Sequence, residues 1–368
     1  MFSMSELEAA LALVHDSFPG TPQYAWPLLA ERCGAEVWVK HENYTPTGAF
    51  KLRGGLIYAE RLRRERSHAR GIVSATRGNH GQSLAWAGRR YGIPVTVVVP
   101  HGNSVEKNAA MRAFGARLVE SGDDFEMARD EAARLAASEG LEFAPSFAPD
   151  LVKGVATYSL ELFRTAPPLD ALYVPIGLGS GICGAIKVRD LLGLKTEIIG
   201  VQASGAPAYA RSFEEGRVVA LNRAETNADG VAVRQPDPDA FAIIRAGAAR
   251  IVTVSDEAIA DAIRAYFAYR RDQEWVKLRR IIREGRGALV VGMAFLFVCG
   301  AAGVLSARAW SEPFGSFLKE GFLIIGWVAL WRPVEMLLYD WRPIRKEYRL
   351  LERLARMPVR FTTLQTRA

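Results

Sequence analysis

The segment HENYTPTGAFKLRG, residues 41–54, places Lys51 between Phe50 and Leu52, directly after a Gly-Ala step. A lysine shielded by apolar neighbours loses hydration of its ammonium form, so its pKa falls and its neutral amine can attack a carbonyl group. Lys51 is therefore a candidate nucleophile, although an ordinary solvated lysine fits the same letters. Three polar residues before it suit turn and helix-capping positions equally well: Asn43, Thr45 and Thr47.

A second segment, SATRGNHGQ at residues 74–82, follows a predicted strand at residues 72–73. Small residues there let the backbone turn tightly and direct N–H groups into one space, where the N-terminus of a following helix adds positive potential. Such a loop can hold a carboxylate. A capped turn before a helix is the alternative interpretation.

A third segment, GLGSGICG at residues 177–184, lies between a predicted strand at 171–176 and a predicted helix that runs to Asp190. Glycines that expose successive N–H groups at a helix start form an anion site suited to phosphate. This loop is therefore a candidate phosphate site.

Nicotinamide binding is the main alternative for the same loop, since Gly179-x-Gly181-x-x-Gly184 fits the dinucleotide fingerprint. That fingerprint needs an acidic residue after the next strand, which is predicted at residues 197–201. The residues that follow that strand are neutral: Gln202, Ala203 and Ser204. We therefore disfavour a dehydrogenase, and the lack of a GxxxxGK[ST] run argues against a P-loop nucleotide hydrolase.

Around these segments, short β-branched runs alternate with longer amphipathic stretches. The predicted strands are residues 37–39, 72–73, 95–99, 117–119, 171–176, 197–201 and 251–254, and helices are expected at 125–138 and 256–266. Alternation of this kind predicts an α/β fold with largely parallel sheets. The 368 residues are enough for two domains. The three cysteines show no metal-binding spacing, which predicts no zinc site and a reducing compartment, and the acidic N-terminus makes a secretory signal unexpected.

The charge of the chain is unevenly distributed. Residues 1–268 carry 29 Lys and Arg against 31 Asp and Glu, whereas residues 269–368 carry 18 against 9. The net charge of +7 therefore comes from the tail, which also holds five of the eight tryptophans. A nucleic-acid partner is not expected, because the folded α/β part is not basic.

The tail contains two apolar stretches. Residues 287–307 hold no charge and are long enough to cross a membrane, although a buried core helix is the alternative. Residues 321–339 are interrupted by Arg332, Pro333 and Glu335, so this stretch either crosses as a kinked helix with an Arg332–Glu335 contact or lies in the interface. Basic residues before the first stretch and after the second predict that both ends face the cytoplasm. The last basic stretch, after residue 341, fits an amphipathic surface helix or a solvated one.

Taken in order, the lysine, asparagine-loop and glycine-loop segments resemble the fold type II pyridoxal-phosphate-dependent enzymes, most closely the serine/threonine dehydratase branch, over about residues 21–267. The resemblance implies a two-domain, tryptophan synthase β-like α/β fold. It also implies a large cofactor domain at residues 1–70 plus 147–267 and a smaller inserted domain at residues 71–146. The basic tail at residues 268–368 lies outside the resemblance.

The resemblance also implies roles for individual residues. Lys51 would bind pyridoxal 5'-phosphate covalently and move the substrate Cα proton, and Asn79 would contact the phenolic oxygen of the ring. The substrate carboxylate would lie against Ser74, Thr76, Arg77, Gly78 and His80, and the phosphate against Gly177, Leu178, Gly179, Ser180 and Gly181. The implied reaction is α,β-elimination from L-threonine or L-serine to a 2-oxo acid and ammonia, and an amino-acid racemase is an alternative on the same scaffold.

The chain departs from the family pattern in four places. Leu178 and Ser180 interrupt a run of glycines, Arg77 replaces a small hydroxyl residue, and Ala203 and Tyr209 stand where some relatives carry metal-binding acids, so no metal is predicted. Beyond about Phe267 the end of the catalytic domain is replaced by the tail. A C-terminally truncated, inactive fusion is therefore a further alternative. If the chain is active, we expect a cytoplasmic enzyme for a small amino acid, anchored to the inner face of a membrane by a helical hairpin, with homo-oligomerisation left open.

Overall fold

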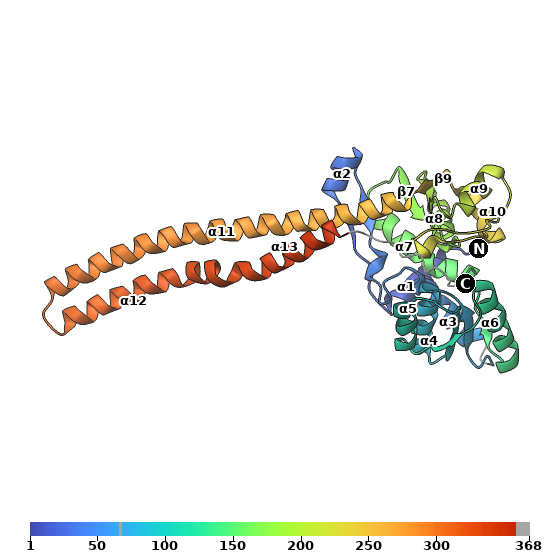
Figure 1. Ribbon diagram of the computed structural model, residues 1–368, viewed down its shortest axis with the longest axis horizontal. Coiled ribbons are helices and arrows are strands. Elements are labelled where there is room, and N and C mark those ends of the chain that lie inside the picture. The colour runs from blue at the N-terminus through green and yellow to red at the C-terminus, as the bar shows by residue number, and fades with distance from the viewer. Residues whose placement is uncertain (66–67, 358–368) are drawn as a thin grey trace. The chain divides into compact units, whose positions relative to one another are not determined.

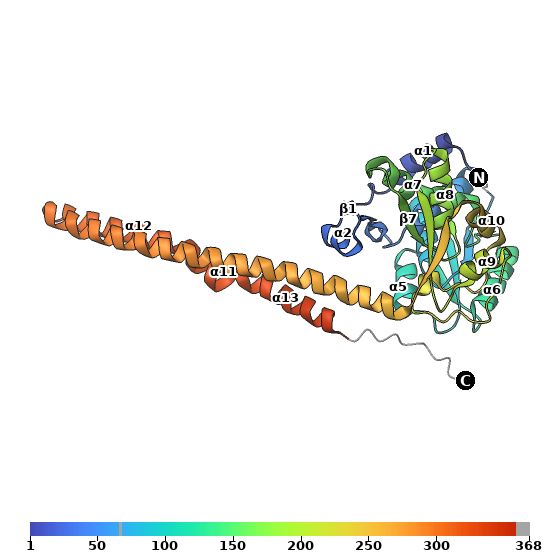
Figure 2. The same ribbon diagram turned by 90° about the horizontal axis from the view of Figure 1, so that it is seen from above.

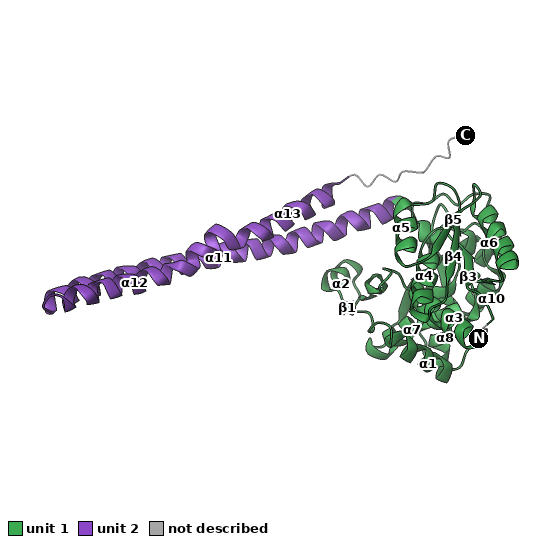
Figure 3. Ribbon diagram, turned by 90° about the horizontal axis from the view of Figure 1, so that it is seen from below, with its two compact units in different colours: residues 1–256, 362–368 green, residues 257–361 purple. Residues whose placement is uncertain are grey.

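The structure, a computed structural model, describes residues 1–65 and 68–357 (Figure 1). Contacts divide the chain into two compact units (Figure 3). The first comprises residues 1–256, and the second begins at Glu257.

The first unit contains the alternating elements that the sequence predicts. Its first part holds α1 (Met4–His15), β1 (Gln23–Ala25), α2 (Pro27–Cys33), β2 (Trp38–Lys40), the 3-10 turn η1 (Glu42–Tyr44) and α3 (Lys51–Glu65). There follow β3 (Ile72–Ala75), α4 (Asn79–Tyr91), β4 (Val95–Val99), α5 (Val105–Ala113), β5 (Arg117–Glu120), α6 (Phe125–Glu139) and β6 (Glu142–Phe143). The unit ends with α7 (Pro149–Thr165), β7 (Ala171–Pro175), α8 (Ser180–Leu191), β8 (Glu197–Ala203), α9 (Ala208–Glu215), η2 (Asp229–Val231), α10 (Pro238–Gly247) and β9 (Arg250–Val254).

Two parallel sheets organise this unit. One has the strand order β5-β4-β3-β6, and the other has the order β7-β8-β9. A short antiparallel pair, β1-β2, stands apart from both in its hydrogen bonding. The predicted α/β class is confirmed, and the carboxyl ends of β3 and β7 lead into the second and third sequence segments, as parallel α/β sheets require.

Local sequence explains where these elements begin and end. The strands β3 and β4 are buried along their whole length, which suits a strand covered by helices on both faces. The carboxylate of Asp124 accepts a hydrogen bond from the N–H of Met127 at the start of α6, and Gly140 ends this helix in the left-handed conformation. In the second sheet only the central strand β8 is mainly buried, and the outer strands β7 and β9 are partly exposed.

The second unit is helical. It contains nearly all of α11 (Asp256–Ala309), followed by α12 (Phe314–Glu335), a π-helical turn η3 (Met336–Asp340) and α13 (Trp341–Arg356). The prediction that a helix ends at Tyr266 is wrong, because α11 continues without a break for 54 residues. The Ala-, Arg- and Glu-rich composition on both sides of Phe267 favours helix, and no proline interrupts it.

The helices α11 and α12 run antiparallel and side by side (Figures 1 and 2). Glycines on both helices lie at their contact, since a Cβ on Gly292 would lie 2.8 Å from Leu330 and one on Gly326 would lie 2.7 Å from Leu296. Small residues at helix contacts are typical of helices that pack in lipid. By length and composition alone, the helical stretches Asp256–Ala309 and Phe314–Arg356 could each cross a membrane, and only 17% of the most apolar window of each is buried.

The charged interruption predicted in the second stretch is paired. Arg332 donates a hydrogen bond to Glu335 at 3.0 Å, as the i,i+3 spacing predicts, and its guanidinium also lies 3.3 Å from Asp340. The expected span at residues 321–339 is not one regular α-helix, because the α-helix ends at Glu335 and the π-helical turn follows.

Candidate active site

Lys51 is the first residue of α3, and a short turn fixes its position. The hydroxyl of Thr45 accepts a hydrogen bond from the N–H of Ala49 at 2.9 Å, and its oxygen lies equally close to the carbonyl of Ala49. Gly48 takes a φ of 66°, which closes the turn. Thr45 therefore serves the turn, the structural alternative that the sequence left open.

The Lys51 side chain is partly buried and makes no ion pair with the carboxylates of the described residues. Its nitrogen lies 5.7 Å from the centre of the Phe50 ring. Burial lowers the pKa of Lys51 to about 8. At pH 7 roughly a tenth of the amine is then neutral, far more than for a solvated lysine with a pKa near 10.4.

Two neighbouring helices hold α3: α7 through close contacts at glycines and α4 through a hydrogen bond. A Cβ on Gly54 would lie 2.7 Å from the carbonyl oxygen of Leu151, and one on Gly154 would lie 2.2 Å from that of Arg53. On another side of α3, the hydroxyl of Ser83 donates a hydrogen bond to the carbonyl of Lys51 at 2.7 Å. The lysine is therefore held between α7 and α4.

A buried ion-pair cluster lies two residues further along α3. Arg53 is 0% exposed, and its guanidinium bonds to Glu42 at 2.8 Å and to Glu161 at 2.6 Å. Lys40 also contacts Glu161, at 2.6 Å. Burial by itself raises the pKa of Glu161, but the hydrogen bonds and charges of Arg53 and Lys40 outweigh it and lower that pKa to about 2. Two cations thus balance two carboxylates beside the lysine helix.

The predicted carboxylate-binding residues extend from the end of β3, which holds Ser74, through the loop of residues 76–78 to the start of α4, which holds His80. The hydroxyl of Ser74 donates to the carbonyl of Ala144 at 2.8 Å, and that of Thr76 accepts from the N–H of Gly78 at 3.1 Å. Both hydroxyls therefore shape the loop. The side chains of Arg77 and Asn79 are exposed.

His80, the second residue of α4, is buried, unlike Arg77 and Asn79 just before it. Burial and, to a smaller extent, the charge of Lys51 together lower the pKa of His80 to about 3, so the imidazole is neutral. Its Nε2 atom is buried and has no hydrogen-bond partner among the described residues. An unpartnered polar atom close to Lys51 suits contact with a bound molecule.

The loop after β7 leads directly into α8. Gly179 precedes the helix with a φ of 108°, and a Cβ there would lie 2.9 Å from Ala240. Only glycine adopts this backbone conformation readily. The N–H groups of the first helical turn are left without helical partners, so this end of α8 can bind an anion.

Two buried tyrosines support the same loop. Tyr209 donates to the carbonyl of Leu178 at 2.8 Å and accepts from the N–H of Asp237 at 3.1 Å. Tyr158 donates to the carbonyl of Gly181 at 3.4 Å, and its ring packs edge-on against Phe50 with the centres 6.0 Å apart. Sequence reasoning missed both supporting roles and that of Arg53, because their contacts join residues 11 to 108 positions apart.

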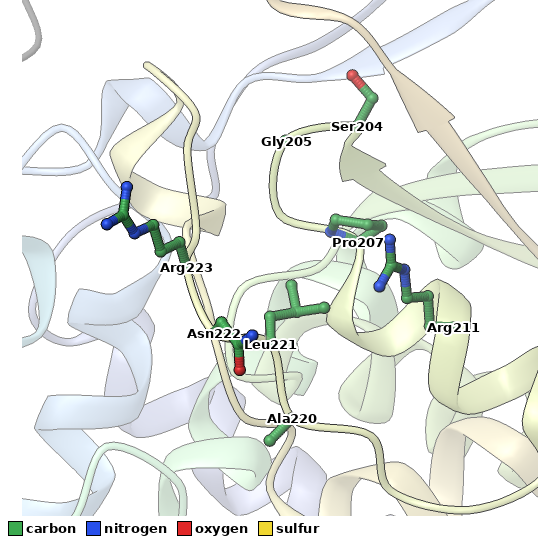
Figure 4. A pocket seen from close by; sticks show the side chains of 8 residues that line it. All are labelled: Ser204, Gly205, Pro207, Arg211, Ala220, Leu221, Asn222 and Arg223. Atoms are coloured by element: carbon green, nitrogen blue, oxygen red, sulfur yellow. The ribbon is translucent and has the colours of Figure 1, made fainter.

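A separate hollow of about 300 Å³ lies at the carboxyl end of β8 (Figure 4). Its lining holds two arginines and no carboxylate: Ser204, Gly205, Pro207, Arg211, Ala220, Leu221, Asn222 and Arg223. Across the residues that the structure describes, no cluster of three or more His, Cys, Asp or Glu residues is arranged to hold a metal ion.

Comparison with known proteins gives a consistent result. The sequence model of a family described as "Pyridoxal-phosphate dependent enzyme" matches residues 14–273. The chain is 32% identical over 265 residues to the L-threonine ammonia-lyase of Thermotoga maritima, which covers 72% of this chain and 64% of that protein. The chain thus spans less than two thirds of the length of this relative.

Solved structures agree with the sequence relatives. The processed form of threonine deaminase isoform 2 from Solanum lycopersicum matches with a TM-score of 0.67 and 30% identity over 73% of this chain and 79% of that one. A pyridoxal 5'-phosphate-dependent aspartate racemase matches with a TM-score of 0.68 and 28% identity, over 72% and 83% of the two chains.

Proposed function

Because the chain belongs to the pyridoxal-phosphate-dependent enzymes of fold type II and is similar to threonine dehydratases, we propose that it is an ammonia-lyase acting on L-threonine or L-serine. The products are 2-oxobutanoate or pyruvate, each with ammonia. The observation that carries the proposal is the amine of Lys51, which has a lowered pKa, has no ion-pair partner in the described part of the chain and lies near a neutral His80.

The residues present fit pyridoxal phosphate. A partly neutral amine suits its aldehyde carbon, and the start of α8, where Gly179 leaves no room for a Cβ, suits its phosphate. When bound, this cofactor accepts the electron pair left at the substrate Cα as the proton departs. In the proposal, Lys51 holds the cofactor and then takes and returns that proton.

The remaining roles belong to the two loops. Main-chain N–H groups of residues 177–181 hold the phosphate, and Asn79 contacts the phenolic oxygen of the ring. Residues 74–80 receive the substrate carboxylate, chiefly through the main chain, since the Ser74 and Thr76 hydroxyls are engaged within the fold. The neutral imidazole of His80 lets Lys51 gain and lose a proton without a second positive charge beside it.

An amino-acid racemase is the second candidate, and the similarity to the aspartate racemase structure favours it. Both reactions begin with loss of the Cα proton. They separate afterwards, because elimination expels the β-hydroxyl, whereas racemisation returns a proton to the opposite face of Cα. Arg77, which stands in the carboxylate loop, is a candidate for altering this outcome.

We further propose that the tail anchors the enzyme to the inner face of a membrane. The support is the exposure of large apolar side chains on both long helices, among them Phe297, Val298, Ile324 and Trp327. Such side chains are stable on a helix surface in lipid, whereas in water they would drive association. The division of the α/β part into domains at residues 1–70 plus 147–267 and 71–146 also stays a proposal.

The test uses the full chain, purified in a mild non-ionic detergent and supplied with pyridoxal phosphate. Release of 2-oxo acid and ammonia from L-threonine or L-serine supports the lyase, and inversion of the amino acid without keto acid supports the racemase. Lys51→Ala should abolish turnover, whereas Lys195→Ala, at an exposed lysine away from the loops, should not. A wild-type protein that binds the cofactor but is silent with every amino acid tested would favour an inactive fusion.

A further inference from the structure

A lysine outside the three sequence segments lies against the carboxylate loop. Lys107 is the third residue of α5, and its side chain crosses the backbone at Gly78. A Cβ placed on Gly78 would lie 2.9 Å from Cδ of Lys107 and 3.3 Å from its Nζ. The ammonium group is therefore within contact distance of the loop proposed to receive the substrate carboxylate.

The ammonium group of Lys107 pairs with Asp229, the first residue of η2. The next residue, Gly230, packs on the phosphate loop, since a Cβ on Gly177 would lie 2.6 Å from the Gly230 carbonyl oxygen. This one ion pair thus joins the carboxylate loop to the phosphate loop.

The segment that carries Asp229 is anchored from its other side. The carboxylate of Asp256 accepts hydrogen bonds from the hydroxyl of Thr226 at 2.6 Å and from the N–H of Asn227 at 2.8 Å. Asp229 therefore has a fixed position, whereas Lys107 has a flexible four-carbon side chain.

The pair is partly open to solvent, with the Lys107 side chain 32% exposed and that of Asp229 48% exposed. Solvent screens such pairs, so an incoming anion can displace one partner at little cost. Thr76, Gly78 and His80 are buried, so a substrate carboxylate at this loop meets the ammonium group in a less hydrated place than Asp229 does. A charge-assisted hydrogen bond is stronger there.

We propose that Lys107 is a ligand of the substrate carboxylate, and that Asp229 competes for its ammonium group until the substrate arrives. The proposal rests on the proposed function, because it assumes that an amino acid binds at the loop of residues 74–80. The proposed competition can be distinguished from a purely structural ion pair. If the pair were only structural, removal of either partner would change the affinity for the amino acid in the same direction. If Asp229 competes with the substrate, its removal raises that affinity, whereas removal of Lys107 lowers it.

The experiment measures the binding of L-alanine, which has no β-hydroxyl to expel, to the cofactor-loaded full chain by the change in visible absorption. Lys107→Met should raise the dissociation constant about tenfold or more, and Lys107→Arg should restore most of the affinity. Asp229→Asn should lower the dissociation constant by about two- to fivefold. The matched control is Arg112→Met, which breaks the exposed ion pair between Arg112 of α5 and Glu120 of β5. This variant should leave the dissociation constant of L-alanine unchanged.

A similar increase in the dissociation constant for the Lys107→Met and Asp229→Asn variants would overturn the proposal, and so would unchanged binding in Lys107→Met. Retention of cofactor absorption by each variant shows that it has folded. If the wild-type chain binds L-alanine but releases no keto acid from L-threonine or L-serine, the proposed lyase function fails, while the opposite shifts of the two variants still support the role of Lys107. If no amino acid binds at all, both proposals fail.

Discussion

Replacement of Arg53 by methionine should strongly destabilise the α/β unit. The guanidinium is fully buried and bonds to Glu42 and Glu161. Its removal leaves two carboxylates with Lys40 as the main nearby cation. Breaking a buried pair on one side costs about 3–5 kcal/mol, because the partner charge stays desolvated. A loss of this size is a large part of the 5–15 kcal/mol typical of a folded domain.

The effect should depend on pH in a defined direction. The folded-state pKa of Glu161 is about 2, below its ordinary value of 4.5, so this carboxylate stabilises the fold above about pH 4.5 and loses that contribution as the pH falls toward 2. In Arg53→Met, the guanidinium no longer offsets the effect of burial on the pKa of Glu161, so this carboxylate takes up a proton more readily. The difference in stability between wild type and variant should therefore shrink between pH 7 and pH 4.

The assay is urea unfolding of the full chain in non-ionic detergent, since urea does not screen charge. The double variant Arg53→Met/Glu42→Gln should recover at least about 1 kcal/mol relative to Arg53→Met, because it restores the balance of one cation and one carboxylate. Arg117→Met, which breaks an exposed pair with Glu139, should cost no more than about 1 kcal/mol. A loss below 1 kcal/mol in Arg53→Met, or costs that simply add in the double variant, would refute the reasoning.

Three further predictions concern the cofactor site and the tail. The rate at which the cofactor-free protein captures pyridoxal phosphate, measured by stopped-flow absorbance, should rise about tenfold per pH unit below about pH 8. It should level off above pH 8, because Lys51 is then neutral. A rate that continues to rise up to pH 10 would contradict the lowered pKa of Lys51. Gly179→Val should weaken cofactor binding, measured by equilibrium dialysis, at least tenfold, because the φ of 108° excludes a β-branched residue. Gly193→Ala should not weaken it, because Gly193 also has a positive φ but has open space around it. Phe297→Arg, at a position 79% exposed on α11, should reduce the amount of protein recovered in alkali-washed membranes, since a central charge costs about 2.5–3.5 kcal/mol on insertion. Val276→Arg, before the apolar stretch, should not reduce it. Equal recovery of the two variants would argue against the span.

The sequence predicted the backbone setting of two of the three segments. The loop after β3 and the glycine loop between β7 and α8 are short segments in which residue type and spacing limit the backbone. The supporting contacts were not predictable in this way. Tyr158 and Tyr209 reach the glycine loop from other helices, and no local pattern distinguishes them from ordinary core residues.

For the tail, the sequence predicted the apolar stretches but not where the first helix begins and ends. Its apolar length was evident, and the Arg332–Glu335 contact followed from helical spacing. The continuity of α11 through Phe267 is not evident from the sequence, because the composition changes there while the helix does not end. Helix propensity on the two sides is similar, so a shift in charge and hydropathy does not interrupt the backbone hydrogen bonds.

The glycine contacts around α3 limit how this scaffold can diverge. Since Gly54 and Gly154 leave no space for a single added methyl group between α3 and α7, the position of the reactive amine is fixed by backbone against backbone. The side chain of Arg77, in the loop after β3, is by contrast exposed. Substitution at such an exposed position can change the surroundings of the loop while Lys51 stays where the two helices hold it.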